Sequence, residues 1–231
     1  MKVIGLIGGM SWESTAEYYR IINQAVKERL GGFHSARILL YSVDFHQVEA
    51  LQQEGRWQEA TEILLDAARR VQRGGADFVL ICTNTMHKVA TEVEAAISIP
   101  LLHIADATAS EISKRGIRRI ALLGTKYTME DDFYKGRLVR QHGLEVMIPP
   151  EPERNTVHRV IYDELCVGNI VAGSRTELVR IIGDLGTRGA EGVILGCTEL
   201  SLLIKEEDSP LPLFDTTAIH ARSAVDLALR H

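Results

Sequence analysis

The chain alternates short apolar runs with longer segments in which apolar residues recur every three or four positions. The apolar runs, rich in Val, Ile and Leu, predict buried strands. The clearest of these expected strands cover residues 3–7, 36–43, 99–104, 119–124, 143–148 and 212–216. Amphipathic helices are expected at residues 59–73, 130–142, 156–165, 174–188 and 218–229. A strand-helix-strand order throughout predicts an α/β fold, with parallel sheets that carry helices on both faces.

Two stretches repeat each other, Gly75 to Met86 and Gly189 to Leu200. In both, a Gly-Ala-acid turn leads into an apolar run that stops at small polar residues. Thr83 and Cys197 therefore take equivalent positions, 114 residues apart. Two more pairs repeat at offsets of 116 and 112 residues, namely 4–9 with 120–125 and 100–102 with 212–214. Three segments that recur in the same order predict two copies of one α/β unit.

The duplication predicts two pseudo-symmetric units, each a short parallel sheet flanked by helices, with an active site in the cleft between them. We assign residues 1–100 with 211–231 to the first unit and residues 101–210 to the second. Residues 150–154, proline-rich and polar, are expected to form a loop inside the second unit rather than an independent linker.

Composition narrows the class of protein. Of 231 residues 45% are hydrophobic and 25% charged, which is typical of a globular protein with a sizeable core. The net charge of −5 and the lack of a basic stripe argue against a nucleic-acid partner. No apolar stretch approaches the ~18 residues of a membrane span. With no signal-peptide pattern and three cysteines, an odd number, we expect a cytoplasmic protein whose thiols are reduced.

Side chains that can carry chemistry follow four predicted strands: Met10, Thr83, Thr125 and Cys197. Ligands of parallel sheets collect outside the carboxyl ends of the strands, so these residues are expected around one cleft. The start of a helix after Cys197 would lower the pKa of its thiol below the usual ~8.5 and make it a nucleophile or base. The alternative for Cys197 is a small core residue.

Other candidates have plainer alternatives. Met10 and Ser11 either contact a ligand or belong to a tight turn that Gly8-Gly9 permits. The polar segment 49–57 is either the start of a helix or a lid, with Gln52 and Arg56 as its most ligand-like side chains.

Cys82 falls one residue too early to match Cys197, so we place it in the core, and Cys166 likewise. His87 is expected to cap a helix or face solvent, the alternative being that it orients the Thr83 loop. No Cys/His spacing predicts a metal site.

Four motifs together resemble the aspartate/glutamate racemase family: residues 8–15, 83–87, 124–125 and 196–200. The resemblance covers almost the whole chain, and the ordered combination is more specific than any single motif. It implies a cofactor-independent amino-acid racemase, without pyridoxal phosphate or metal, that binds a small amino-acid substrate and forms a homodimer.

In that family two cysteines flank the α-carbon of the substrate, and the match assigns their roles to positions 83 and 197. This chain has Thr83 in place of the first cysteine. The resemblance implies that the Cys197 thiolate removes the α-proton, while Thr83 or a water it holds returns one to the other face. Threonine is a far poorer base than a thiolate, so proton removal is expected mainly from the face that Cys197 sees. Because the second-half cysteine of the family generally serves the L-enantiomer, the resemblance implies a preference for L-substrates.

The resemblance also implies substrate contacts. Asn84, Thr85 and Thr198 are expected to hold the α-carboxylate, and Glu199 to lie beside the thiol. Gln52 and Glu164 are expected to read the side chain. Relatives often have lysine where this chain has Glu164, and a carboxylate there would repel a dicarboxylic substrate unless Arg56 or Lys126 compensates. A neutral or amine-bearing side chain is thus an option. Alternatives are a single-cysteine decarboxylase or cis-trans isomerase of the same superfamily, and a small-molecule sensor that has lost catalysis.

Overall fold

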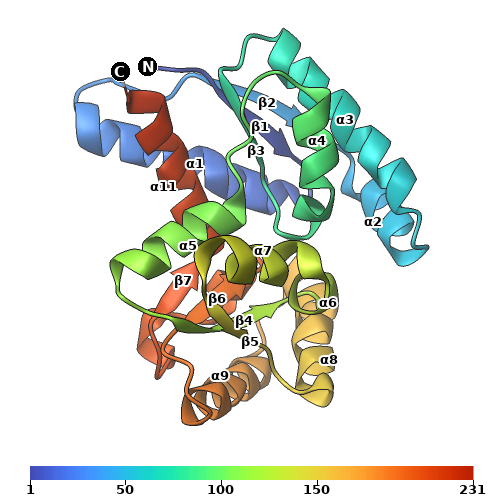
Figure 1. Cartoon of the computed structure of the whole chain (residues 1–231), viewed down its shortest axis with the longest axis vertical. Helices are drawn as coiled ribbons and strands as arrows, with labels where there is room; N and C mark the ends of the chain where they lie inside the picture. Colours follow the sequence, from blue (N-terminus) through green and yellow to red (C-terminus); the bar gives the residue numbers. More distant parts are fainter. Residues whose placement is uncertain (231) are drawn as a thin grey trace. The chain divides into compact units, whose positions relative to one another are not determined.

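The computed structural model describes residues 1–230, which form two compact units (Figure 1). The first unit contains Met1–Ile104 and the chain from His220 onward, and the second contains Ala105–Ile219. Our prediction places the return to the first unit at residue 211. The structure places it at His220 because β7 (Leu213–Asp215) pairs with β6 (Val193–Gly196) in the second sheet. Both units are α/β, as predicted.

The first sheet is parallel, with the order β2-β1-β3. Its strands are β2 (Ile38–Ser42), β1 (Ile4–Gly8) and β3 (Phe78–Ile81). Beyond β3 the chain adds one parallel bridge, Val79 to Leu101, where the sequence predicts a strand over 99–104. The strand stays short because α5 (Ile104–Lys114) begins directly after it.

Helices lie on both sides of this sheet (Figure 1). On one side α3 and α4 pack Leu64, Val71 and Val93 against Ile7, Val79 and Ile81 of the strands. On the other side α1 carries the fully buried Tyr18 and is joined to α11 by a hydrogen bond to His220. These helices are α1 (Trp12–Leu30), α2 (Phe45–Gln53), α3 (Trp57–Arg73), α4 (Ala90–Ala96) and α11 (Thr216–Leu229), with the 3-10 helix η1 (Thr85–Val89) before α4.

The second sheet repeats this topology, with the order β5-β4-β6-β7. Its further strands are β4 (Arg119–Gly124) and β5 (Glu145–Met147). In the first sheet Val79 lies between Gly5 and Leu101, and in the second Val193 lies between Ala121 and Leu213. These three pairs are separated by the three offsets found in the sequence. The register therefore confirms that the chain contains two copies of one unit.

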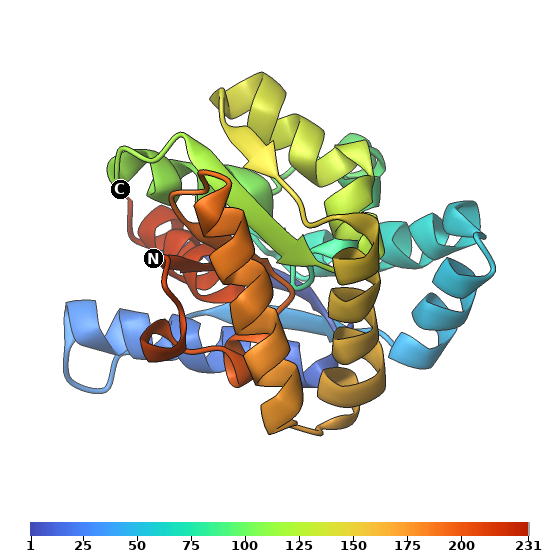
Figure 2. The same cartoon turned by 90° about the horizontal axis from the view of Figure 1, so that it is seen from below.

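The second sheet is covered by α5, α7, α8 and α9, and α8 and α9 run side by side (Figure 2). Residues 150–154 are not the loop that we predict from the sequence, because α8 begins at Glu151. Pro152 falls in the first turn, where a missing backbone N–H costs nothing. The helical segments of this unit are α6 (Lys126–Glu130), α7 (Asp132–His142), α8 (Glu151–Arg159), the π-helix η2 (Val160–Glu164), η3 (Leu165–Val167), α9 (Ala172–Thr187), α10 (Leu200–Leu203) and η4 (Glu206–Asp208).

None of the helices described within residues 1–230 has the length and apolar character needed to cross a membrane.

The turn after β1 depends on Gly9, which gives a test of the fold. Gly9 has φ 91°, and a Cβ atom there would lie 2.1 Å from the Val43 carbonyl oxygen. We expect Gly9→Ala to destabilise the protein by about 3 kcal/mol, since left-handed strain adds to a backbone clash. Gly55, with φ 70° and nothing within 4 Å, is the matched control, and Gly55→Ala should cost about 1 kcal/mol. Urea unfolding of both variants measures the difference; equal losses would contradict the close approach.

Candidate active site

The two equivalent strand ends present one accessible reactive group each. Thr83 is partly exposed between the buried residues Cys82 and Asn84, and Cys197 is partly exposed after the buried Gly196. Each follows the strand that lies beside the first strand of its own unit, Thr83 after β3 and Cys197 after β6. Cys82 is fully buried in the core, as predicted. The sequence repeat thus identifies two residues that share a structural position but differ in chemistry.

The Cys197 thiol is paired with a carboxylate. Its Sγ–H donates to Glu199 Oε2 at 3.0 Å, and Glu199 is only 7% exposed. Burial raises the pKa of the Cys197 thiol well above its usual range, and the negative charge of Glu199 raises that pKa further. Our expectation of a lowered pKa is therefore wrong. The helix that follows, α10, has only four residues and its weak dipole is outweighed by the carboxylate in contact with the sulfur.

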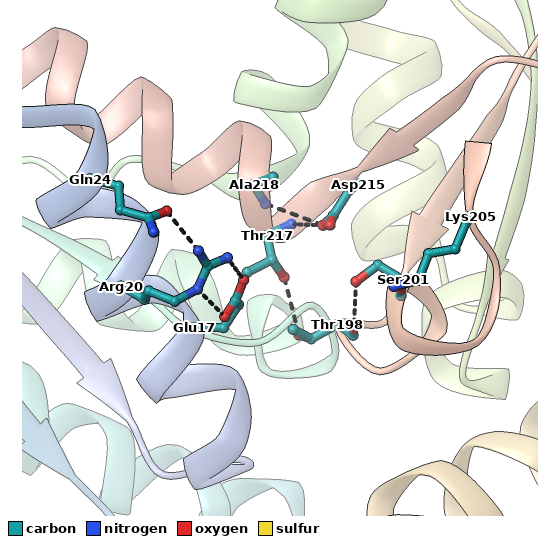
Figure 3. A network of polar contacts seen from close by, with 9 residues as sticks. All are labelled: Glu17, Arg20, Gln24, Thr198, Ser201, Lys205, Asp215, Thr217 and Ala218. Carbon is teal, nitrogen blue, oxygen red and sulfur yellow. Dashed lines mark hydrogen bonds and ion pairs between the residues drawn. The ribbon is translucent and has the colours of Figure 1, made fainter. Parts of the chain in front are cut away.

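A polar network supports the loop that carries Cys197 (Figure 3). Ser201 donates to the Thr198 carbonyl at 2.9 Å, and the Thr217 hydroxyl donates to the Thr198 hydroxyl at 3.1 Å. The Asp215 carboxylate in turn accepts from the backbone N–H groups of Thr217 and Ala218. Because the Thr198 hydroxyl accepts a hydrogen bond from Thr217, its own O–H can donate a hydrogen bond to a ligand.

Cys166 is not the core residue that we predict. It lies in η3, partly exposed, and its negative charge when deprotonated also raises the pKa of Cys197. The two sulfurs therefore belong to one region of the second unit. Sequence spacing gave no sign of this, because the π-helix before Cys166 changes the direction of the side chains that follow it.

The Thr83 loop is held from inside the first unit. Asn84 and Thr85 are buried where η1 begins. His87 is 2% exposed and its Nδ1 lies 2.7 Å from the Thr83 carbonyl oxygen. His87 is therefore not exposed, and it contacts the Thr83 loop, so the expectation that it faces solvent is wrong. No hydrogen bond to the Thr83 hydroxyl is found within residues 1–230, so this hydroxyl is available to a ligand.

Gln52 and Arg56 differ in position. Gln52 is 4% exposed, and its Nε2 group donates to the Met86 sulfur at 3.0 Å, which brings α2 to the start of η1. Arg56 is exposed and forms ion pairs with Glu54 and Glu59 at 2.7 and 2.6 Å. Of the two candidates, only Gln52 lies beside the Thr83–Thr85 loop.

The residues after β1 and β4 both serve as helix caps. Ser11 accepts from the Ser14 N–H at the start of α1, and Thr125 accepts from the Thr128 N–H at the start of α6, each at 3.3 Å. Met10, next to Ser11, is 5% exposed. These contacts give Ser11 and Thr125 a structural role at the strand ends.

Glu164 is the last residue of the π-helix, and its two carboxylate oxygens have different surroundings. Its Oε1 accepts from Arg159 at 3.0 Å, whereas its Oε2 is buried and has no hydrogen-bond partner in the part of the chain that the structure describes. A buried carboxylate oxygen without a hydrogen-bond partner is energetically costly. Across residues 1–230 no group of three His, Cys, Asp or Glu side chains is placed to hold a metal ion.

The sequence profile of Asp/Glu/hydantoin racemases matches residues 7–224 of this chain. The chain belongs to this racemase family. It is 22% identical to the broad specificity amino-acid racemase RacX of Bacillus subtilis, and the alignment covers 99% of both proteins.

Solved structures agree with the family. A candidate Asp/Glu racemase of Yersinia pestis is 56% identical over the whole of both chains, with a TM-score of 0.94. An aspartate racemase homologue of Pyrococcus horikoshii is 38% identical, also over both whole chains, with a TM-score of 0.86. The two parallel sheets with flanking helices are thus the fold of Asp/Glu racemases.

The thiol–carboxylate pair predicts a pH dependence. The raised pKa of Cys197 keeps the thiol protonated at neutral pH, so alkylation of Cys197 by iodoacetamide should be slow at pH 7 and still increase above pH ~9. Glu199→Gln removes a charge that disfavours the thiolate and should move this rise to lower pH. At a pH below the pKa, alkylation should become about tenfold faster for every pH unit by which the substitution lowers that pKa.

Peptide mass spectrometry separates Cys197 from the partly exposed Cys166. Glu206→Gln, in η4 of the same unit and exposed, is the control and should leave the profile unchanged. A Glu199→Gln profile that coincides with wild type would show that the carboxylate does not act on the thiol.

Proposed function

We propose that this protein is a cofactor-independent amino-acid racemase in which Cys197 removes the α-proton and Thr83 returns one. The observation that carries the proposal is the equivalence of the two residues. Both follow the corresponding strand of a duplicated unit and both are partly exposed, but one carries a thiol and the other a hydroxyl. Membership of the racemase family supports the reaction class.

The proton transfers balance as follows. The Cys197 thiol first gives its proton to Glu199 or solvent, and the resulting thiolate takes the proton from the α-carbon of an L-amino acid. The α-carboxylate takes up the negative charge of the carbanion, held by Asn84, Thr85 and Thr198. Thr83, or a water bound to it, then donates a proton to the opposite face and is reprotonated by solvent. Where Glu199 took the thiol proton, it releases that proton to solvent, so that every group returns to its starting state. No external cofactor takes part in these steps.

The contact between Cys197 and Glu199 supports this scheme. A thiol with a raised pKa is a poor base until its proton has an acceptor, and a buried carboxylate at 3.0 Å is such an acceptor. The same contact weighs against a sensor that has lost catalysis, because ligand binding alone does not require a thiol paired with a buried carboxylate.

An asymmetry between enantiomers follows from the two side chains. The equilibrium constant of racemisation is one, so kcat/KM for racemisation must be equal in both directions. Exchange of the α-proton with solvent has no such restriction. Cys197 can remove the α-proton of an L-amino acid and return a proton to the same face many times. Threonine is too weak a base to do this for a D-amino acid.

The side-chain specificity is proposed to depend on Glu164 and Gln52. The buried, unpartnered Oε2 of Glu164 suits a cationic or hydrogen-bond-donating side chain and disfavours a second carboxylate. Arg56 is engaged by two surface glutamates, so it does not compensate this charge. We therefore favour amine-bearing or neutral substrates over aspartate and glutamate. The homodimer implied by the family resemblance, like the cytoplasmic location, stays a prediction.

Deuterium exchange tests the reaction. In D₂O without added cofactor, NMR should show exchange at the α-carbon of L-amino acids, much slower exchange of D-amino acids, and D-product at a lower rate than L-exchange. Cys197→Ser should reduce L-exchange at least ~100-fold, the usual contribution of a general base. Thr83→Ala should abolish D-product while L-exchange persists, and Thr83→Cys should speed exchange of D-amino acids.

Cys166→Ser is the control and should retain exchange. Equal exchange of both enantiomers by wild type would contradict the role of Thr83. No exchange across a panel of amino acids would favour the single-cysteine decarboxylase or cis-trans isomerase. Decarboxylation of a disubstituted malonate or isomerisation of maleate would identify either of these.

A charge reversal tests the specificity. Glu164→Lys should lower kcat/KM for L-lysine and L-ornithine relative to L-aspartate and L-glutamate by about tenfold or more, because it replaces an attraction in a partly buried site by a repulsion. The neighbouring Asp163 is exposed, so Asp163→Lys is the matched control and should leave the ratio unchanged. A ratio that shifts equally in both variants would point to the overall charge of the surface instead.

A further inference from the structure

We propose that His87 positions Thr83, by fixing the peptide group that follows it, so that the threonine hydroxyl is aimed as a proton donor. This role rests on the proposed function. His87 touches no reacting atom in the proposed scheme and is therefore a positioning residue.

The protonation state of the His87 ring follows from its two partners. Nδ1 lies 2.7 Å from the Thr83 carbonyl oxygen, which can only accept. Nε2 lies 3.2 Å from the backbone nitrogen of Ile104, which can only donate. The ring is therefore the neutral tautomer with its proton on Nδ1, and it donates to Thr83 while accepting from Ile104.

The bond controls the direction of the Thr83 side chain. The chain is fixed just before Thr83, because the Cys82 N–H donates to the Ile7 carbonyl at 2.9 Å and so extends the pairing of β3 with β1. His87 fixes it just after Thr83 through the carbonyl oxygen. With the backbone held on both sides, the Cα–Cβ bond of Thr83 has one direction, which matters because a misplacement of about 1 Å can reduce a rate ~100-fold.

A rigid surround keeps the His87 ring in place. The ring packs on His103 with 4.5 Å between ring centroids and on His220 with 5.9 Å. His220 Nε2–H donates to the Leu102 carbonyl at 2.7 Å, and its Nδ1 accepts from the Tyr18 hydroxyl at 2.8 Å. All of these groups belong to the first unit, and all three histidines are at most 3% exposed.

The second unit has no such imidazole. The position equivalent to His87 is Ser201, whose hydroxyl binds the Thr198 carbonyl. The Cys197 carbonyl instead accepts from the backbone N–H of Leu200 at 3.2 Å. The carbonyl of Thr83 is therefore bound by a side chain, whereas the carbonyl of Cys197 is bound by a backbone N–H. The additional imidazole occurs in the first unit, whose proposed acid, Thr83, is weaker than a thiol. Its small hydroxyl must be positioned more accurately than the large, polarisable sulfur of Cys197.

Two amide substitutions separate the bonds of His87. The amide nitrogen of asparagine lies about where Nδ1 lies, so His87→Asn keeps the donor to Thr83 and loses the bond to Ile104. The amide of glutamine reaches about the position of Nε2, so His87→Gln keeps an acceptor for Ile104 and loses the bond to Thr83. His103→Gln, which alters the packing on His87, is the control.

The readout is the rate of D-product formation divided by the rate of α-deuterium exchange into the L-substrate in the same sample. Exchange depends on Cys197 and normalises for folding and substrate binding. We expect His87→Gln to lower this ratio about tenfold or more, and His87→Asn and His103→Gln to leave it within about twofold of wild type. A purely structural role would lower both rates together and leave all ratios equal.

An unchanged ratio in His87→Gln would overturn the proposal, as would an equal fall in His87→Asn. If His87→Gln does not fold, His87→Asn decides alone, because a tenfold fall there contradicts a role that its amide nitrogen should preserve. Failure of the proposed function is a separate result, since it shows as an absence of Cys197-dependent exchange in wild type.

Discussion

The parallel pairing of β1 with β3, and of β4 with β6, is the constraint on which the site depends. In a parallel sheet the N–H and C=O groups of a strand are satisfied by its neighbours, and the chain is released only where pairing ends. The paired residues end at Ile81 in the first unit, followed by one further hydrogen bond from the Cys82 N–H, and at Gly196 in the second. The residues released next include Thr83 and Cys197, so the same register that builds each core also places one reactive side chain at its edge.

Electrostatics at the two edges differ. Cys197 lies beside a buried carboxylate, and its pKa is raised, so the resting state is a thiol that donates a hydrogen bond. The Thr83 carbonyl instead accepts from the buried imidazole of His87, which is neutral because its other nitrogen accepts from the Ile104 N–H. In the proposed reaction, Cys197 is a base that must first lose its proton, whereas Thr83 is an acid that needs no prior ionisation.

Much of this could be predicted from the sequence because periodicity and repetition are local signals. The strand-helix order and the repeat at 114 residues led to the correct fold and to the equivalence of Thr83 with Cys197. What the sequence could not reveal depends on contacts between distant residues. His87 is buried because the 101–104 segment and α11 cover it, and the pKa of Cys197 depends on which way Glu199 turns. The helix that begins at Glu151 could not be predicted, because prolines occur both in loops and in the first turn of a helix.

The hydrogen bonds that hold each reactive loop come from the same unit as the loop itself. Imidazole holds the first loop, and a serine with a helical turn holds the second. After a duplication of this kind, each copy contains the hydrogen-bonding groups that hold its own loop. Either half can then acquire a new acid, base or binding group by substitutions that do not disturb the other half, and one ancestral scaffold can give rise to descendants with different chemistry.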